Sequence, residues 1–448
     1  MPCCVKAYSL RRSFESRTLR TLFRPQRITF MDDQSSKEGS IELMNQPFTG
    51  QLGNRLIELL DSSDYHTLNI VVAFAKNSGV LRIKDSLESF RDRGGIVNAY
   101  VGVDLGGTSY EALITLLLHT DALGIVHSEK SQTFHSKIYQ FLGEEKGLIV
   151  VGSHNLTGGG LWTNFESSVI IPIVSSRKDD FQVLNGLDDY IGNLTSLNES
   201  FMLISTQDDI DNLFENGYVF KEVYEQVRLA KAEIQNGTRE CIFGNGVPAK
   251  LPKVSAHKID KLATASVPTA ENIFARRNDE GQTIWFETKS MTGGSRNIFD
   301  LSKRSLIEHG DPIGTPFDLG DPAFMRGGVE FFDLNPTDTD QIKNITLNFE
   351  GVDYIGNSIL FPSGDNANGT WRLQIKGISS SGNKITDAFR TKGEVYYLVG
   401  KIITFTKIQS NYYFMSVFQG SEIEDFKAAS RILARNGSTK NAKRMGLL

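Results

Sequence analysis

The sequence is poor in cysteine: its 448 residues include only Cys3, Cys4 and Cys241. Three cysteines at this spacing provide neither a disulfide framework nor a zinc site, so we expect a protein of the reducing cytoplasm. No apolar run approaches the roughly 18 residues of a membrane-spanning helix, so no membrane partner is expected. A phosphate-binding GxxxxGK[ST] loop is also missing, so any ATPase that the protein needs must be a separate chain.

The sequence also lacks a strong net charge, because 48 basic and 53 acidic residues leave −5 at neutral pH. This balance does not indicate a surface that binds polyanions everywhere, so contacts to nucleic acid would have to come from local basic surfaces. The hydrophobic content of 40% and the charged content of 23% are ordinary for a globular protein. The length is enough for two or three domains, each with its own core.

Both ends of the sequence are basic. Residues 1–31 hold seven basic residues and one acidic residue, a local charge of +6, and have the composition of an organellar transit peptide. Two other interpretations are a disordered basic arm, or translation assigned upstream of a true start at Met31. Within the last segment, 426–448, residues 430–448 have five basic residues and no acidic residue. We expect a solvated tail there, with non-specific phosphate contact as an alternative.

Residues 40–200 show strands alternating with helices. Helical spacing of apolar residues predicts helices over 52–63, 80–93 and 107–119. Runs rich in β-branched and aromatic residues predict strands over 67–75, 96–103, 124–128, 135–142, 147–151 and 167–174. The alternation favours an α/β layered domain, whose chemistry is expected at the loops that leave the strands.

The rest of the sequence divides into a connector and a β-rich part. Residues 201–272 are typical of a helical connector, with amphipathic segments over 208–216 and 219–235, followed by a proline-containing linker. Residues 273–425 contain short apolar runs separated by Gly, Asn, Asp and Pro turns, which predict a barrel or sandwich. The strands are expected over 283–289, 329–334, 342–350, 371–378, 395–407 and 411–418.

Three short segments carry residues suited to phosphodiester chemistry: FHSK at 134–137, GSHNLTG at 152–158 and NFE at 164–166. Residues two apart on a strand project from the same face, so His135 and Lys137 should point into one site. A histidine can attack phosphorus and leave again, and a lysine supplies positive charge without a metal ion. This pair alone would be common by chance, and the joint pattern of the three segments is what indicates a site.

The second and third segments supply hydrogen-bonding groups. Ser153 and Asn155 can donate to the oxygens of a phosphate, and Glu166 can hold the Nδ1–H of His135 so that Nε2 attacks. His154 lies beside them and is interpreted as a loop or core residue, with substrate contact as the alternative. The other histidines have no metal-ligand spacing and are interpreted as ordinary residues: His66, His119, His127, His257 and His309.

FHSKIYQF followed by VGSHNLTGGGLWTNFESSVII resembles the phospholipase D superfamily, and most of all its nuclease branch, the restriction endonucleases of the BfiI/NgoFVII type. The resemblance covers about residues 65–175. It assigns the family's catalytic residues to His135, Lys137, Ser153, Asn155 and Glu166. The family's usual aspartate, five residues after the lysine, is Leu142 here. The nuclease branch often lacks that aspartate, so this departure disfavours a lipase.

The resemblance also implies how the site is assembled. In this superfamily two motifs form one active site, in which one histidine attacks phosphorus and the other protonates the leaving group. Among seven histidines, only His135 is followed by a lysine two residues later. We therefore expect a homodimer with one composite site on its two-fold axis, without a cofactor or a metal ion.

The β-rich segment 273–425 resembles the DNA-recognition half of the same enzymes, a pseudobarrel like the DNA-binding domain of plant transcription factors. That family grips the major groove with two loop arms, whose polar side chains contact base edges. The alternative for each candidate is an ordinary solvated loop residue. The candidates for DNA contact are Lys289, Ser290, Arg296, Asn297, Lys303 and Arg304 in a first arm, and Tyr354 and Asn357 in a second loop.

Three functions follow from these observations. The first is a sequence-specific, type II-like restriction endonuclease that cuts double-stranded DNA, either alone or with a separate ATPase or helicase subunit and a cognate methyltransferase. The second is a phosphodiesterase of the same superfamily that acts on phospholipids or other substrates. The third is a non-catalytic DNA-binding defence protein, which the complete motif disfavours.

Overall fold

The structure is a computed structural model, and it describes residues 40–130, 132–174, 176–235, 246–254, 282–289, 297–362, 370–392 and 396–448. The basic segment 1–31 and most of the predicted linker therefore lie outside the described residues. Secondary structure within these ranges forms two sheets, which follow one another along the chain.

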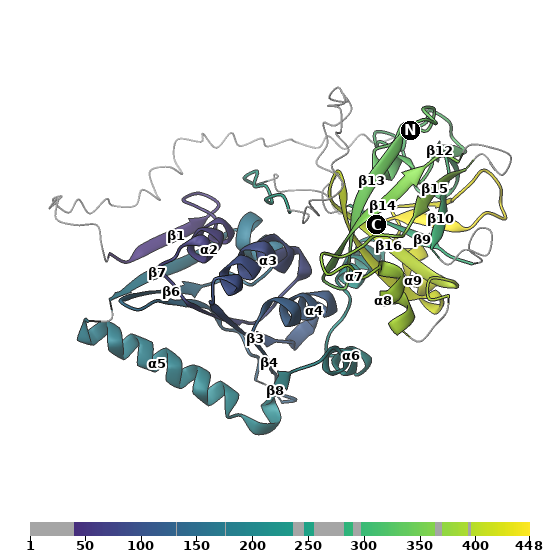
Figure 1. The fold of residues 1–448 in the computed structure, drawn as a ribbon. Helices are drawn as coiled ribbons and strands as arrows, with labels where there is room; N and C mark the ends of the chain where they lie inside the picture. Colours follow the sequence, from purple (N-terminus) through teal and green to yellow (C-terminus); the bar gives the residue numbers. More distant parts are fainter. Residues whose placement is uncertain are drawn as a thin grey trace, which may run out of the picture. The chain divides into compact units, whose positions relative to one another are not determined.

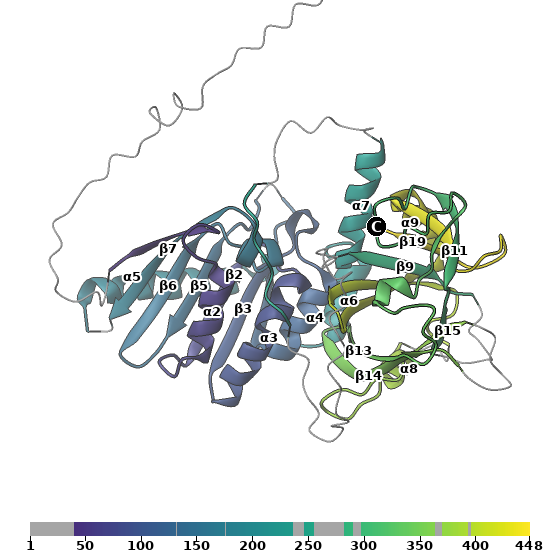
Figure 2. The same ribbon diagram turned by 90° about the horizontal axis from the view of Figure 1, so that it is seen from above.

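The first sheet has eight strands in the order β1-β7-β6-β5-β2-β3-β4-β8. Figure 2 shows β7, β6, β5, β2 and β3 side by side in this order. The pairings β2–β3 and β3–β4 are parallel, and all other neighbours are antiparallel. The strands are β1 (Glu42–Gln46), β2 (Thr67–Val72), β3 (Ile96–Gly102), β4 (Ala122–Val126), β5 (Lys137–Leu142), β6 (Lys146–Gly152), β7 (Glu166–Val174) and β8 (Phe201–Ile204).

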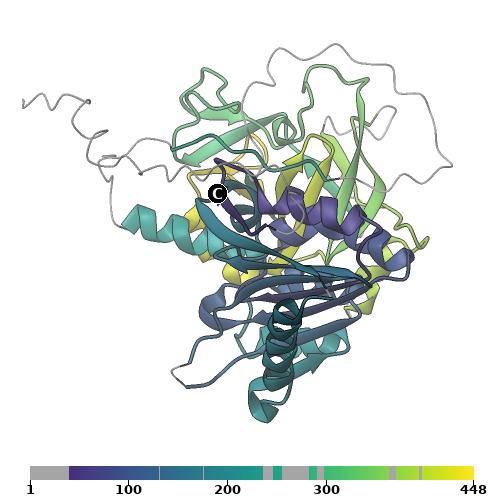
Figure 3. The same ribbon diagram turned by 90° about the vertical axis from the view of Figure 1, so that its left-hand side faces the viewer.

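Helices cover both faces of this sheet (Figure 1). On one face lie α2 (Leu52–Asp61), α3 (Asn77–Asp92) and α4 (Tyr110–His119), whose apolar residues join the strands in one large core. On the other face lies α5 (Lys178–Thr195), which packs against Ile149 and Ile173 through Leu187. Figure 3 shows the same layering from the side. Burial on both faces explains why the central strands are largely apolar. Their polar residues Asn69, Asn98 and Gln140 are hydrogen-bonded to one another, because Asn69 Nδ2 donates to Gln140 Oε1 and Asn98 Nδ2 donates to Asn69 Oδ1.

The predicted α/β alternation is confirmed for this part of the chain. Every strand and helix expected from periodicity between residues 52 and 174 is present, with boundaries shifted by up to three residues. Three elements were not predicted: the edge strands β1 and β8, and helix α5. Both edge strands are short, and α5 has an exposed polar face with few buried residues, so their periodic signal is weak.

Two helices follow, α6 (Gln207–Glu215) and α7 (Glu222–Gln235), at the positions predicted for the connector. Thr206 caps α6, because its hydroxyl accepts from Asp209 N while the Asp209 carboxylate accepts from Thr206 N. Helix α7 buries Val223 and Val227 in a cluster with Trp285 and Phe426.

The second sheet has eleven strands in the order β10-β15-β14-β13-β17-β16-β9-β19-β18-β11-β12. All of its pairings are antiparallel except β13–β17. Two short helices accompany it, α8 (Ile385–Thr391) and α9 (Ile423–Ala429). The strands are β9 (Thr283–Glu287), β10 (Ile298–Leu301), β11 (Arg304–His309), β12 (Phe324–Arg326), β13 (Ile342–Phe349), β14 (Val352–Leu360), β15 (Trp371–Gln374), β16 (Lys401–Gln409), β17 (Tyr412–Gln419), β18 (Ile432–Arg435) and β19 (Arg444–Leu447).

Two predictions for this part are wrong. Residues 329–334 do not form a strand: Glu330–Phe332 is a single turn of 3-10 helix, which places Phe331 and Phe332 in the core of the second sheet. The segment 426–448 is not a solvated tail. It provides β18 and β19, and β19 pairs with β9 while burying Met445 and Leu447. Long-range strand pairing, which a basic composition does not reveal, decides the conformation of this end.

Candidate functional site

The topology of the first sheet gathers the candidate residues at one edge. Strands β5, β6 and β7 are adjacent and antiparallel, so the start of β5, the end of β6 and the start of β7 lie side by side. Lys137 begins β5, Ser153 directly follows β6, and Glu166 begins β7. Parallel β2 and β3 also end at this edge, since Val72 at the end of β2 pairs with Lys137. The five candidate residues predicted from the sequence therefore share one end of the sheet.

His135 and Lys137 contact each other directly. Lys137 Nζ lies 2.8 Å from His135 Nδ1 and donates to His135 O at 2.9 Å. Lys137 is 8% exposed, whereas His135 is exposed and precedes the strand that was expected to include it. Burial lowers the pKa of Lys137, and the nearby Glu166 carboxylate opposes this shift. The buried amine thus faces an imidazole that remains open to solvent.

Glu166 has different partners from those expected. Its carboxylate accepts hydrogen bonds from Ser153 Oγ and, at 3.3 Å, from Asn164 Nδ2. Ser167 N in turn donates to Ser153 Oγ at 3.0 Å, which fixes the hydroxyl. The prediction that Glu166 holds the Nδ1–H of His135 is wrong for a single chain, because Nδ1 faces Lys137 instead.

Asn155 links two parts of the site. Its Oδ1 accepts from Phe74 N at 3.2 Å, and the Phe74 ring lies edge-on to the His135 imidazole with 6.0 Å between centroids. Within the described ranges, Asn155 Nδ2 makes no hydrogen bond, so it remains available as a donor. The chain after it passes close to α3, where a Cβ on Gly79 would lie 2.7 Å from Leu156 O. This close approach explains the glycine at the start of α3.

His154 is a core residue, as interpreted from the sequence. It is 1% exposed and its Nδ1 is hydrogen-bonded to the Ser168 hydroxyl. Burial lowers the pKa of His154 to about 4, so the imidazole is neutral at physiological pH. His154 therefore packs inside the domain next to the candidate site and does not contact solvent.

The depressed pKa of His154 predicts a loss of stability in mild acid. As pH falls below the ordinary value near 6.5, the unfolded chain takes up a proton that folded His154 does not accept until about pH 4. The contribution of neutral, buried His154 to the free energy of unfolding is therefore fully present above pH 6.5. It falls by about 2 kcal/mol between pH 7 and pH 5. Urea unfolding at both pH values should show that His154→Gln reduces the pH dependence by about this amount. The same substitution at exposed His66 is the control, and equal pH dependence in wild type and His154→Gln would contradict the assignment.

Two further polar residues, Asp104 and His127, lie at this end of the sheet, and His127 was interpreted from the sequence as an ordinary residue. Asp104 Oδ2 accepts from Phe134 N at 3.0 Å, next to His135, and Asp104 Oδ1 lies 2.8 Å from His127 Nδ1. His127 follows β4, and Asp104 follows β3 by two residues. Both positions lie at the carboxyl ends of parallel strands, where polar residues are expected to have functional roles. That signal was present in the sequence, but neither residue belongs to the motif segments.

The candidate DNA-contacting residues of the first arm differ in the partners of their side chains. Lys289 lies just after β9, and its amine is 3.8 Å from Glu287. Asn297 Nδ2 donates to Ile375 O at 2.7 Å, which ties it to the strand region after β15. Lys303 lies over the Phe361 ring, and Arg304 stacks on Phe324 and pairs with Asp321. Ser290 and Arg296 lie outside the described residues.

The second predicted DNA-contacting loop does not exist. Tyr354 and Asn357 lie on strand β14 and are 5% and 0% exposed. Asn357 uses its whole amide inside the sheet: Nδ2 donates to Tyr354 O at 2.7 Å, and Oδ1 accepts from Gly377 N at 2.8 Å. The prediction is wrong for both residues, because the β13–β14 ladder buries them.

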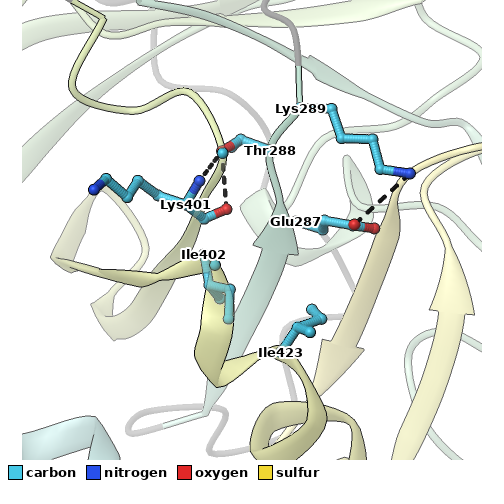
Figure 4. A pocket seen from close by; sticks show the side chains of 8 residues that line it. Glu287, Thr288, Lys289, Lys401, Ile402 and Ile423 are labelled. Atoms are coloured by element: carbon cyan, nitrogen blue, oxygen red, sulfur yellow. Dashed lines mark hydrogen bonds and ion pairs between the residues drawn. The ribbon is translucent and has the colours of Figure 1, made fainter.

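A cavity of about 280 Å³ opens where β9 and β16 meet. Figure 4 shows Lys289 reaching back toward Glu287, and Thr288 bonded to the backbone of Lys401. Lys401 Nζ donates to Gln419 Oε1 at 2.8 Å. Both lysines are engaged with neighbouring side chains, so we assign no ligand to this cavity. Its lining comprises Glu287, Thr288, Lys289, Gly400, Lys401, Ile402, Gly420 and Ile423.

Over the part of the chain that the structure describes, no three His, Cys, Asp or Glu side chains are grouped so that they could hold a metal ion. In the same ranges, no helix has the length and apolar character needed to cross a bilayer.

No family model matches the chain, and neither does any curated protein. Solved structures do resemble part of it. Nuc, a phospholipase D family member from Salmonella typhimurium, is 16% identical, with a TM-score of 0.28, over 38% of this chain and 100% of that chain. NucT from Helicobacter pylori is 17% identical, with a TM-score of 0.28, over 37% and 100% of the two chains. Phosphatidylserine synthase from Haemophilus influenzae is 10% identical, with a TM-score of 0.31, over 45% and 47%. These identities and TM-scores are too low to indicate a function.

Proposed function

We propose that the protein is a phosphodiesterase that cuts DNA through a covalent phosphohistidine and without a metal ion. The observation that carries this proposal is the 2.8 Å contact between Lys137 Nζ and the exposed His135 imidazole. Ser153, Asn155 and Glu166 lie at the same edge of the sheet. A nucleophile, a cation and hydrogen-bond donors are the groups that phosphoryl transfer without a metal requires.

The chemistry has two steps. An imidazole nitrogen of His135 attacks phosphorus and forms an N–P bond while one P–O ester bond breaks, and the leaving oxygen takes a proton. Water then gives up a proton to the group that protonated the leaving oxygen and attacks the phosphohistidine, so that a P–O bond forms while the N–P bond breaks and the imidazole is restored. Lys137 and Asn155 Nδ2 would stabilise the negative charge on the non-bridging oxygens in both steps. Lys137 now contacts His135 Nδ1, so phosphate must take over this amine as the substrate binds.

The leaving oxygen needs a proton donor, and His135 is the one histidine of the sequence that is followed by a lysine two residues later. His154, the histidine nearest in sequence to the motif residues, is buried and has a pKa of about 4. We therefore propose a homodimer in which the partner's copy of His135 is the acid, so that two chains share one site.

The eleven-stranded part of the chain would select the DNA. Among the candidates that the structure describes, Lys289, Lys303 and Arg304 are basic and lie at or near the surface. In this proposal the protein is a restriction endonuclease of the cytoplasm. A cognate methyltransferase would protect the host DNA, and a separate ATPase or helicase subunit is the partner to test first.

Plasmid cleavage in EDTA tests the proposal. We expect nicking or cutting of mixed plasmid DNA in EDTA, and a ³²P-labelled protein intermediate that is labile in acid and stable in base, as a phosphoramidate is. Lys137→Met should lower kcat by about 10²- to 10³-fold. Lys146→Met, at an exposed lysine in the same sheet, should leave kcat unchanged. Cleavage that requires a divalent metal, or release of phosphate only from phospholipid, would contradict the proposal.

A further inference from the structure

His135 lies in a segment without regular secondary structure, so other contacts must hold it in place. The residue after it is fixed by two of them: Ala73 N donates to Ser136 O at 2.8 Å, and Ser136 Oγ lies 2.6 Å from Tyr190 Oη on α5. The residue before it is fixed by an acid, because Phe134 N donates to Asp104 Oδ2 at 3.0 Å. His135 therefore lies between two anchored neighbours.

Asp104 is built into the end of the sheet. It is 8% exposed, and its Oδ1 lies 2.8 Å from Nδ1 of His127. One carboxylate thus joins the turn after β3, the end of β4 and the segment that carries His135. Leu105, which follows it, has φ +56° and is 85% exposed. A leucine rarely adopts this left-handed conformation, which persists only where surrounding contacts impose it.

We propose that Asp104 is a positioning residue, which holds Phe134 so that the His135 imidazole stays against Lys137. The proposal rests on the proposed function in taking His135 as the reacting group. The physical reason is that a buried carboxylate makes strong hydrogen bonds to N–H donors, and a displacement of about 1 Å at a nucleophile can cost about 10²-fold in rate.

Cleavage kinetics of three Asp104 variants test whether this residue positions His135. Asp104→Ala removes both acceptors and should lower kcat for DNA cleavage about 10- to 100-fold, while KM changes by less than about threefold. Asp104→Asn should stay within about threefold of wild type, because the amide oxygen still accepts from Phe134 N and its NH₂ can donate to the other tautomer of His127. Asp104→Glu, which keeps the charge but adds one methylene, should resemble Asp104→Ala and also serves if Asp104→Ala does not fold.

Asp121→Ala is the matched control. Asp121 also accepts from a backbone N–H, that of Val97 at 2.8 Å, and pairs with Arg91, but it lies at the opposite ends of β3 and β4. Its loss should leave kcat unchanged. Wild-type kcat in Asp104→Ala, or an equal fall in kcat for Asp121→Ala, would overturn the positioning role.

A measurement that does not use activity separates the two proposals. In long-range ¹H–¹⁵N spectra of protein labelled at histidine nitrogens, the His135 signals should move in Asp104→Ala and Asp104→Glu and stay in place in Asp104→Asn and Asp121→Ala. If the signals move in this way but the wild-type protein does not cleave DNA, the proposed function is rejected and the positioning role of Asp104 is kept. His135 signals that do not move in Asp104→Ala would reject the positioning role, whatever the activity of the wild type.

Discussion

We expect His135→Ala to abolish DNA cleavage, with kcat lower by about 10⁴-fold or more, while DNA binding and the unfolding temperature stay as in wild type. The size follows from the role, because without the imidazole there is no covalent intermediate and only binding and charge stabilisation remain. The imidazole is exposed, so its loss leaves no cavity in the core. Single-turnover cleavage of a labelled duplex measures the rate, and a gel-shift titration measures binding.

Dimers that combine one His135→Ala chain with one wild-type chain test whether the two subunits share one site. His135→Ala chains refolded with an equal amount of wild-type chains should leave about one quarter of the dimers with two intact imidazoles. Activity per wild-type chain should therefore fall to about half, whereas independent monomers would keep it unchanged. His66→Ala, at an exposed imidazole that precedes β2, is the control chain in the same mixture. A preparation shown to be monomeric and fully active would contradict the shared site.

We expect Trp162→Ala to lower the free energy of unfolding by about 3–5 kcal/mol, the range for removing a large buried aromatic side chain. Trp162 is fully buried, its Nε1 donates to Asn54 Oδ1 at 2.9 Å, and a Cβ on Gly53 would lie 2.1 Å from its ring. The ring therefore fills a space that α2 leaves open only because residue 53 is glycine. Urea unfolding followed by circular dichroism measures the change.

Phe165→Ala is the control for this prediction, because the two aromatic residues are close in sequence and differ in burial. Phe165 is 63% exposed and stacks on exposed Phe48, with 5.7 Å between ring centroids. We expect a loss below about 1 kcal/mol at this position. Equal losses in the two variants would show that Trp162 does not anchor the segment between Asn155 and Glu166.

The elements that could be predicted from the sequence are those with a strong local signal. The run of residues 67–72 is rich in β-branched residues because β2 is buried on both faces, and 137–142 includes Ile138, Tyr139 and Phe141, which favour a strand. Helix α5 was missed because it covers the sheet with one narrow stripe and exposes the rest. The end of the chain was missed for another reason. Arg435 and Arg444 both pair with Glu308 across the sheet, and no local pattern reveals such distant partners.

The candidate site shows the same division. The shared sheet edge of His135, Lys137, Ser153, Asn155 and Glu166 could be predicted, because consecutive strands joined by short connections usually pair as neighbours, as β5, β6 and β7 do. The hydrogen-bond partners of these residues, and the burial of two DNA-contact candidates, could not be predicted. Glu166 bonds Ser153 and Asn164 in place of His135, and Tyr354 and Asn357 are buried in β14.

The sequence by itself determined which residues have the chemistry for phosphoryl transfer, because a nucleophilic imidazole, an amine and a carboxylate are properties of the side chains. It also determined the helices and strands of the first sheet, since periodic burial is encoded locally. Only the tertiary structure decided which groups contact each other. Hydrogen bonds such as Asp104 to Phe134, or Lys137 to His135 Nδ1, depend on ångström-scale distances between segments that folding brings together.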